Sequence, residues 1–177
     1  MFSYIFGYLI NTLPDSINVG DSLVIPITVT SRTAHALPSG TSFSREVWVE
    51  IKVISSNGNI IFEKGVLDNS LDLIDYDDTD IILYTTVLYN EENLQGEIIY
   101  EPSNTLSYDD RTLGTLLHDS RIYEIEVDDD LEGEIDIEAT MWFRPFKPQM
   151  LEQFHPSSMS HLPIIEMCSD SVSVIIP

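Results

Sequence analysis

The chain has one cysteine, only eight basic residues and no long apolar run, and each shortage narrows the classes of protein to consider. The single Cys168 cannot form an internal disulfide, so cysteine content leaves the redox compartment open. No stretch reaches the roughly 20 apolar residues of a membrane-spanning helix, so we expect no membrane insertion. Eight Lys and Arg residues against 30 acidic ones cannot form the basic surface that nucleic-acid binding needs, which excludes nucleic acid as a partner.

Catalytic motifs are also missing. The sequence has no Gly-x-Ser-x-Gly elbow, no phosphate-binding loop and no zinc-protease motif. His118, His155 and His161 do not have the spacing of zinc ligands. Paired carboxylates arise by chance in so acidic a chain, so they carry little weight. We therefore expect no enzymatic activity.

Residues 1–13 are apolar but interrupted by Ser3, Gly7 and Asn11, and they include no basic residue. A secretory signal peptide needs a basic start, so the segment does not resemble one. We interpret it as either an N-terminal strand or the start of a fragment. With 177 residues and 43% hydrophobic content, the chain can bury one substantial core, and we assign residues 1–177 to a single domain.

Acidic residues are concentrated in the middle of the chain. Between Asp68 and Glu138, twenty-two acids accompany only Arg111 and Arg121, which accounts for −20 of the net charge of −22. Such a field repels anionic lipid and favours cations or a basic partner. The simpler interpretation is a solvated surface that keeps the protein soluble.

The alternative interpretation of this segment is a calcium site. Asp68, Asp72, Asp75 and Asp77 offer the hard carboxylate oxygens that calcium prefers. The spacing departs from an EF-hand loop, because Leu73 stands where that loop requires glycine for its sharp turn. Both interpretations remain open at this stage.

Short runs rich in Val, Ile, Thr and Tyr alternate with turn residues along most of the chain. This pattern predicts an all-β, immunoglobulin-like antiparallel sandwich of about eight strands with long loop excursions. The predicted strands are residues 4–13, 22–31, 44–55, 59–64, 80–89, 121–127, 133–144 and 171–176. Residues 148–154 show the spacing of one short helix. Residues 91–120 and 145–163 are predicted to be ordered, irregular excursions.

Two local features refine this prediction. Asn57 and Gly58 stand between two alternating runs, which is the strongest short-range signal for a β-hairpin. Pro26 interrupts an otherwise regular strand and lacks a backbone N–H, so that strand is predicted to lie at an edge or to carry a bulge.

Three parts of the chain carry motifs in a recognisable order. They are residues 33–40 (TAHALPSG) with 45–50 (REVWVE) and 57–65 (NGNIIFEKG), then 67–73 (LDNSLDL), and finally 139–148 (ATMWFRPFKP) with 162–167 (LPIIEM). Together they resemble the carboxy-terminal, haem-free β-sandwich domain of multihaem c-type cytochromes. The resemblance covers roughly residues 15–175. One departure is Ala34, where the family usually has glycine before the loop histidine.

The resemblance implies an accessory or docking domain of an extracytoplasmic electron-transfer system, periplasmic or extracellular. Covalent haem attachment needs Cys-x-x-Cys-His, in which two thiols bond the haem and the histidine ligates iron. The chain lacks this motif, so we expect no covalently bound haem. The implied partner is a haem-bearing cytochrome region or subunit.

His35, with Pro38 and Gly40, is the candidate for haem contact or partner docking. It lies in a loop, and loops at the ends of sandwiches often carry binding sites. A neutral imidazole there would contact, or even ligate, a partner's haem. The alternative is that His35 only satisfies backbone groups of its own loop.

Arg45, Trp48 and Arg144 are predicted to be structural anchors. Each arginine stands beside a core strand, where it would bind a carboxylate or loop carbonyl groups. Aromatic residues on strands more often fill cores than bind ligands. The alternative function, from another class, is a calcium-stabilised adhesion or carbohydrate-binding module.

The acidic middle generates a first prediction. Crowded carboxylates repel one another, so the free energy of unfolding should rise with ionic strength. Calcium should stabilise beyond sodium only if the folded chain holds a calcium site. Thermal unfolding in sodium chloride and calcium chloride at equal ionic strength measures both effects. Equal melting shifts would remove calcium from the candidate ligands, and the absence of any salt effect would contradict the crowding.

Overall fold

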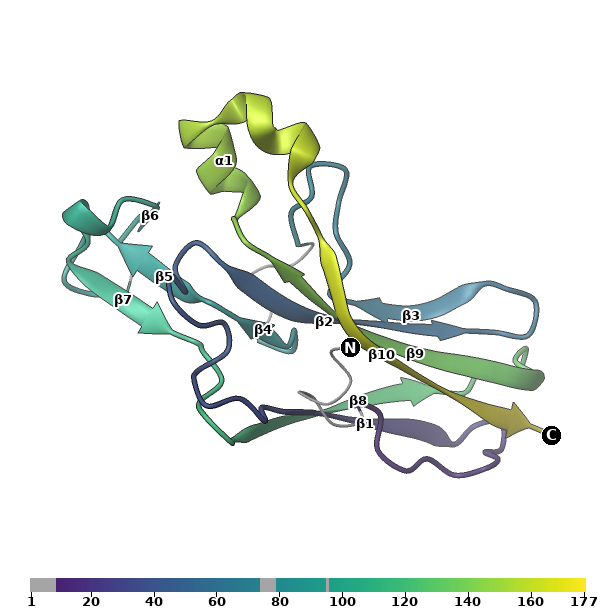
Figure 1. Ribbon diagram of the computed structural model, residues 1–177. Coiled ribbons are helices and arrows are strands. Elements are labelled where there is room, and N and C mark those ends of the chain that lie inside the picture. Colours follow the sequence, from purple (N-terminus) through teal and green to yellow (C-terminus); the bar gives the residue numbers. More distant parts are fainter. Residues whose placement is uncertain (1–8, 74–78, 95) are drawn as a thin grey trace.

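The computed structural model, which describes residues 9–73, 79–94 and 96–177, is an all-β sandwich of antiparallel strands (Figure 1). Its main sheet has the strand order β10-β9-β2-β3, with the short β4 also paired to β2. A second sheet contains β1 and β8, and a smaller third sheet has the order β6-β5-β7. The strands are β1 (Ser22–Thr30), β2 (Glu46–Ile54), β3 (Ile60–Lys64), β4 (Leu83–Tyr84), β5 (Thr86–Tyr89), β6 (Ile98–Ile99), β7 (Ser107–Asp110), β8 (His118–Glu126), β9 (Gly133–Arg144) and β10 (Ile165–Ile176).

The core lies between the main sheet and the β1-β8 sheet. Side chains alternate between the two faces of a strand, so every second residue of β1, of β2 and of most of β9 is apolar and buried. The inward-facing residues are Leu23, Ile25, Ile27 and Val29 on β1, Val47, Val49, Ile51 and Val53 on β2, and Ile135, Ile137, Ala139 and Met141 on β9. The predicted all-β sandwich is therefore confirmed.

The hairpin between β2 and β3 is also confirmed. Gly58 has a φ of +84°, a conformation that glycine adopts without steric cost. The Ser55 N–H donates to the Asn59 carbonyl oxygen at 2.9 Å, and the Asn59 N–H donates to Asn57 Oδ1 at 3.0 Å. One backbone hydrogen bond and one hydrogen bond to a side chain thus hold the turn.

Pro26 interrupts no hydrogen bond between β1 and β8. These strands pair without a register shift from Ser22↔Glu126 to Thr30↔His118. The Pro26 carbonyl oxygen accepts the Asn11 N–H at 3.0 Å on the opposite side of β1. Because both polar groups of a strand residue point the same way, the missing donor faces residues 9–11 rather than β8.

Several predicted boundaries were wrong. The single strand predicted over residues 80–89 is two strands, β4 and β5, because the Thr85 hydroxyl between them donates to the Arg45 carbonyl oxygen at 2.9 Å and fixes a corner. Strand β10 begins at Ile165, six residues before the predicted start. Of the strand predicted over residues 4–13, residues 4–8 lie outside the described residues, and Ile10 forms only an isolated bridge to Ile27.

The two excursions contain short elements. Residues 91–120 hold β6, β7 and the 3₁₀ helix η1 (Pro102–Asn104), none of which was predicted. Helix α1 (Pro148–Phe154) has the predicted bounds and precedes the 3₁₀ helix η2 (Pro156–His161). Among the described residues, no helix has both the length and the hydropathy needed to cross a membrane.

Gly65 provides a test of the packing. It has a φ of +69°, and a Cβ atom there would lie 2.2 Å from the Val49 carbonyl oxygen. Gly58 also has a positive φ, but a Cβ there would meet nothing within 4 Å. Gly58→Ala should cost about 1–2 kcal/mol of unfolding free energy through backbone strain alone. Gly65→Ala should cost about 1–3 kcal/mol more through overpacking. Chemical denaturation measures both, and equal losses would contradict the close approach at Gly65.

Candidate functional site

His35 lies exposed in the loop that joins β1 to β2. Its Nδ1 donates to the Ala36 carbonyl oxygen at 3.1 Å, and the Thr33 hydroxyl donates to the His35 carbonyl oxygen at 2.5 Å. The other ring nitrogen, Nε2, has no hydrogen bond to any described residue. The imidazole is thus oriented by its own loop while one nitrogen faces solvent.

The His35 loop is fastened to the turn that precedes β8. Leu37 and Leu113 exchange two backbone hydrogen bonds, at 2.8 and 2.9 Å. The Ser31 N–H donates to the Leu117 carbonyl oxygen at 2.9 Å. Residues 31–40 and 113–118 therefore form one surface, which we call the His35 end.

Arg45 holds the far side of the same loop. Its Nη1 donates to the Ser39 carbonyl oxygen at 2.5 Å. Gly40, with a φ of +74°, lies directly against this guanidinium, since a Cβ atom there would be 3.1 Å from Nη1. Pro38, within the loop, is buried. The loop is therefore held in place before any partner binds, which reduces the entropy lost on docking.

The most unusual residues of the His35 end were not predicted from the sequence. Leu116 has a φ of +58° and is 71% exposed, and the adjacent Leu117 is 57% exposed. A bulky residue in this conformation costs about 1–3 kcal/mol, and burial of its side chain does not offset that cost here. The only signal in the sequence was an apolar pair just after Gly114 in a segment predicted to be irregular.

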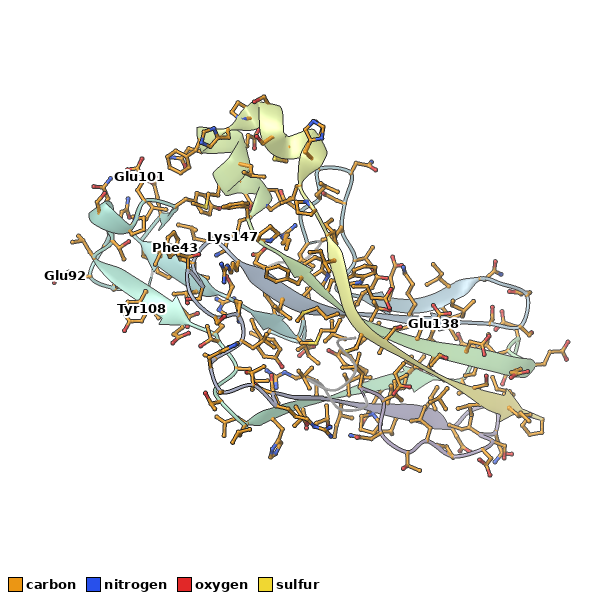
Figure 2. The ribbon with its side chains drawn as sticks, viewed as in Figure 1. Phe43, Glu92, Glu101, Tyr108, Glu138 and Lys147 are labelled. Carbon is orange, nitrogen blue, oxygen red and sulfur yellow. The ribbon has the colours of Figure 1, made fainter. Side chains whose placement is uncertain are left out.

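More exposed apolar side chains lie on the segment that leads to this turn. Of the exposed large hydrophobic residues, six fall within residues 94–117: Leu94, Ile98, Leu106, Tyr108, Leu116 and Leu117. Figure 2 shows Tyr108 on the outer side of β7. The small sheet and the His35 loop extend from the same end of the sandwich (Figure 1). Exposed apolar surface of this kind often marks an interaction site.

Arg144 and Glu46 form a buried ion pair between β9 and β2. Both side chains are fully buried, and Arg144 Nη2 lies 2.5 Å from Glu46 Oε2. Arg144 Nη1 also donates to the Leu71 carbonyl oxygen, and the guanidinium lies 5.2 Å from the centre of the buried Trp48 ring. These contacts bind the 68–72 loop to the main sheet. Arg144 and Trp48 therefore stabilise the fold and are not exposed to a ligand.

Lys147, which the sequence analysis did not single out, is also buried. Its Nζ donates to the Thr86 carbonyl oxygen at 3.0 Å, which ties the chain before α1 to β5. Figure 2 shows Lys147 on the side of the main sheet that faces the small sheet. Burial lowers the pKa of Lys147 to about 8, although the Glu46 carboxylate acts in the opposite direction.

The described calcium candidates serve the local loop. Asp68 Oδ1 accepts the Ser70 N–H at 2.8 Å and the Asp72 N–H at 2.9 Å. Asp72 Oδ1 accepts the Gln149 Nε2 group at 2.5 Å, and burial raises the pKa of Asp72. Asp75 and Asp77 lie outside the described residues. Within the part of the chain that the structure describes, no three His, Cys, Asp or Glu residues are arranged to hold a metal.

No family model and no curated protein sequence matches the chain. Two solved structures are similar to it. A penta-haem cytochrome c552 from Thermochromatium tepidum is 14% identical with a TM-score of 0.73, and the match covers 98% of this chain and 40% of that one. The C-terminal domain of wzt is 9% identical with a TM-score of 0.40, covering 93% of this chain and 64% of that one.

The sheet arrangement and the cytochrome comparison together define the class of fold. The chain is an all-β sandwich domain that spans 40% of the length of the cytochrome it is similar to. The particular similarity is to a portion of a penta-haem cytochrome, and at 14% identity it shows a shared fold alone.

Lys147 generates a prediction about pH. A folded-state pKa of about 8, against an ordinary value of 10.5, means that folding disfavours the charged amine. The penalty is fully present below pH 8 and is lost as the pH rises towards 10.5. The free energy of unfolding of the wild type, relative to that of Lys147→Met, should therefore rise by about 3 kcal/mol across this window. Lys52→Met, at a side chain that is 28% exposed on β2, is the control for the loss of a lysine elsewhere in the sheet. A pH-independent difference for Lys147→Met would contradict its burial as a charged group.

Proposed function

We propose that the chain is a non-catalytic docking domain of an extracytoplasmic multihaem cytochrome system. In this proposal the His35 end binds a haem-bearing region or subunit. The observation that carries it is the strained, exposed turn at Leu116 and Leu117, fastened by backbone hydrogen bonds to the His35 loop. Burial of two adjacent exposed leucines by a partner would stabilise the complex. In the isolated chain, no burial of the Leu116 side chain offsets the strain in its backbone.

The fold comparison supports the choice of partner. A domain of this fold occurs within a longer chain that is named for five haems. The present chain contains no Cys-x-x-Cys-His motif, so any covalent haem would belong to another region or another polypeptide. The resemblance of residues 33–40 to that family leads to the same proposal.

The contacts expected at the His35 end are of two kinds. Leu116 and Leu117 would supply apolar area, and the solvent-facing Nε2 of His35 would bond to the partner or contact its haem edge. The loop is fastened at Leu37, Ser39 and Ser31, so docking would immobilise few additional groups. The net charge of −22 would accelerate association with a basic partner and make the rate fall with salt.

A substitution at Leu116 should weaken partner binding without lowering the stability of the domain. Leu116→Gly should remove backbone strain and raise the free energy of unfolding by up to about 1 kcal/mol. It should also weaken binding of the haem-bearing partner by about tenfold, because the exposed side chain is lost. His35→Ala should weaken binding and shift the absorption spectrum of a haem at the interface. The measurement is retention of c-type cytochromes, from the source organism's extracytoplasmic fraction, on the immobilised domain, read by haem staining and the Soret band.

Ile122 provides the matched control. It is 66% exposed and lies on β8, outside the His35 end. Ile122→Ser should leave retention unchanged. Equal retention by the Leu116→Gly and wild-type domains, or no retention of any haem protein by the wild type, would overturn the proposed function.

A further inference from the structure

A cleft of about 590 Å³ opens on one side of the sandwich. One wall comes from residues 79–84, which include β4, and the other from residues 109–113 and from the start of β8. Among the described residues, β4 pairs only with β2 and β8 only with β1, so the cleft lies between two strands with open edges. Its volume is in the range of small-ligand sites, about 300–1,000 Å³.

The cleft brings together the only two basic residues of the acidic middle. Arg111 and Arg121 are ten residues apart in the sequence, and both line this one cleft. Each forms an ion pair with the aspartate two residues before it. Arg111 Nε lies 2.6 Å from Asp109 Oδ2, and Arg121 Nη1 lies 2.6 Å from Asp119 Oδ1. The four side chains are between 24% and 40% exposed, so a bound molecule can reach them.

The ion pair between Arg121 and Asp119 retains unused hydrogen-bonding capacity. A guanidinium has five N–H donors and a carboxylate has about four acceptor positions. In the described contacts, Arg121 donates only through Nη1, to Asp119 and to the Ser120 carbonyl oxygen. Tyr84 Oη donates to Asp119 Oδ2 at 3.3 Å, and burial together with the Asp119 charge raises the pKa of Tyr84, which keeps the phenol a donor. Hydrogen bonds made by charged groups are roughly twice as strong as neutral ones.

The charge of the cleft excludes most ionic ligands. Two arginines and two aspartates cancel, so the cleft carries no net charge to attract a cation. An anion would meet both aspartates inside a protein with a net charge of −22. A zwitterion would place each of its charges close to a like charge, because each arginine lies 2.6 Å from its aspartate. A neutral ligand with several hydroxyl groups binds the unused donors and acceptors and leaves both ion pairs intact.

We propose that this cleft binds a neutral polyhydroxy ligand, a saccharide of one or two rings. Adjacent hydroxyl groups of a sugar donate to Asp109 and Asp119 and accept from Arg121. Ile81, Leu83 and Leu113 also line the cleft and supply an apolar surface for the C–H face of the ring. The cleft shares Leu113 and His118 with the His35 end, but its two ion pairs lie outside residues 31–40 and 113–118, and Leu116 and Leu117 do not line it. The two proposals therefore rest on different side chains.

The test uses a matched pair of double variants. Asp119→Asn with Arg121→Gln replaces one ion pair of the cleft without changing the net charge. The control is Glu50→Gln with Lys52→Gln, because Glu50 and Lys52 form a similar pair two residues apart, at 2.7 Å, on β2 and outside the cleft. The probes are the neutral disaccharides maltose, cellobiose and lactose, with glucuronate, glucosamine and glycine as anionic, cationic and zwitterionic comparisons. Saturation-transfer NMR and calorimetric titration at millimolar concentrations measure binding.

At least one neutral disaccharide should bind, and the cleft variant should weaken it about tenfold or more while the control variant leaves it unchanged. If the cleft variant does not fold, the partly exposed Arg121→Gln alone should produce the same loss. Absence of binding by all three disaccharides, stronger binding by a charged probe, or equal affinity in the two double variants would overturn the proposal. None of these outcomes affects the retention of haem proteins by the His35 end, so the failure of one proposal is distinguishable from the failure of the other.

Discussion

The buried ion pair between Glu46 and Arg144 is the interaction that fixes the end of the main sheet. It joins the first residue of β2 to the last residue of β9, where the main sheet ends. Breaking a buried pair by removing one partner costs about 3–5 kcal/mol, because the remaining charge stays buried. Arg144 also holds the Leu71 carbonyl oxygen and lies against Trp48. Chain segments that continue beyond the sheet, the His35 loop before Glu46 and the helical segment after Arg144, therefore begin from fixed positions.

Charge has a different role inside and outside this sandwich. Inside, Arg144 is paired with Glu46, whereas Lys147 donates to the neutral Thr86 carbonyl oxygen and the cost of burying its charge is only partly offset. Outside, the described carboxylates of residues 68–138 are exposed or half-buried, where water and salt screen them. Arg111 and Arg121 stand between these cases, since each is paired with an aspartate and remains partly exposed. Partial exposure combined with a nearby paired aspartate is what makes the open cleft a candidate binding site.

Prediction from the sequence succeeded where a feature depends on neighbours along the chain. Apolar alternation identified β9 to the residue, and Asn57 with Gly58 identified the hairpin, because pleating and turn conformation are properties of short segments. It failed where contacts between residues far apart in the sequence determine the structure. The corner at Thr85 depends on Arg45, forty residues away, and the two-residue β6 is too short for any period to be visible. Of the candidate site, His35 was found from its loop motif, whereas Leu116 was missed because backbone strain leaves no composition signal.

The sequence by itself determined the all-β class, the hairpin and the absence of a haem-attachment motif. These follow from residue type and spacing over a few positions. Only the tertiary structure decided that the His35 loop is fastened to the turn at Leu116, and that Arg111 and Arg121 share one cleft. The physical reason is that strand pairing between segments as distant as β1 and β8 depends on the free energy of the whole core, to which each local segment contributes only a part.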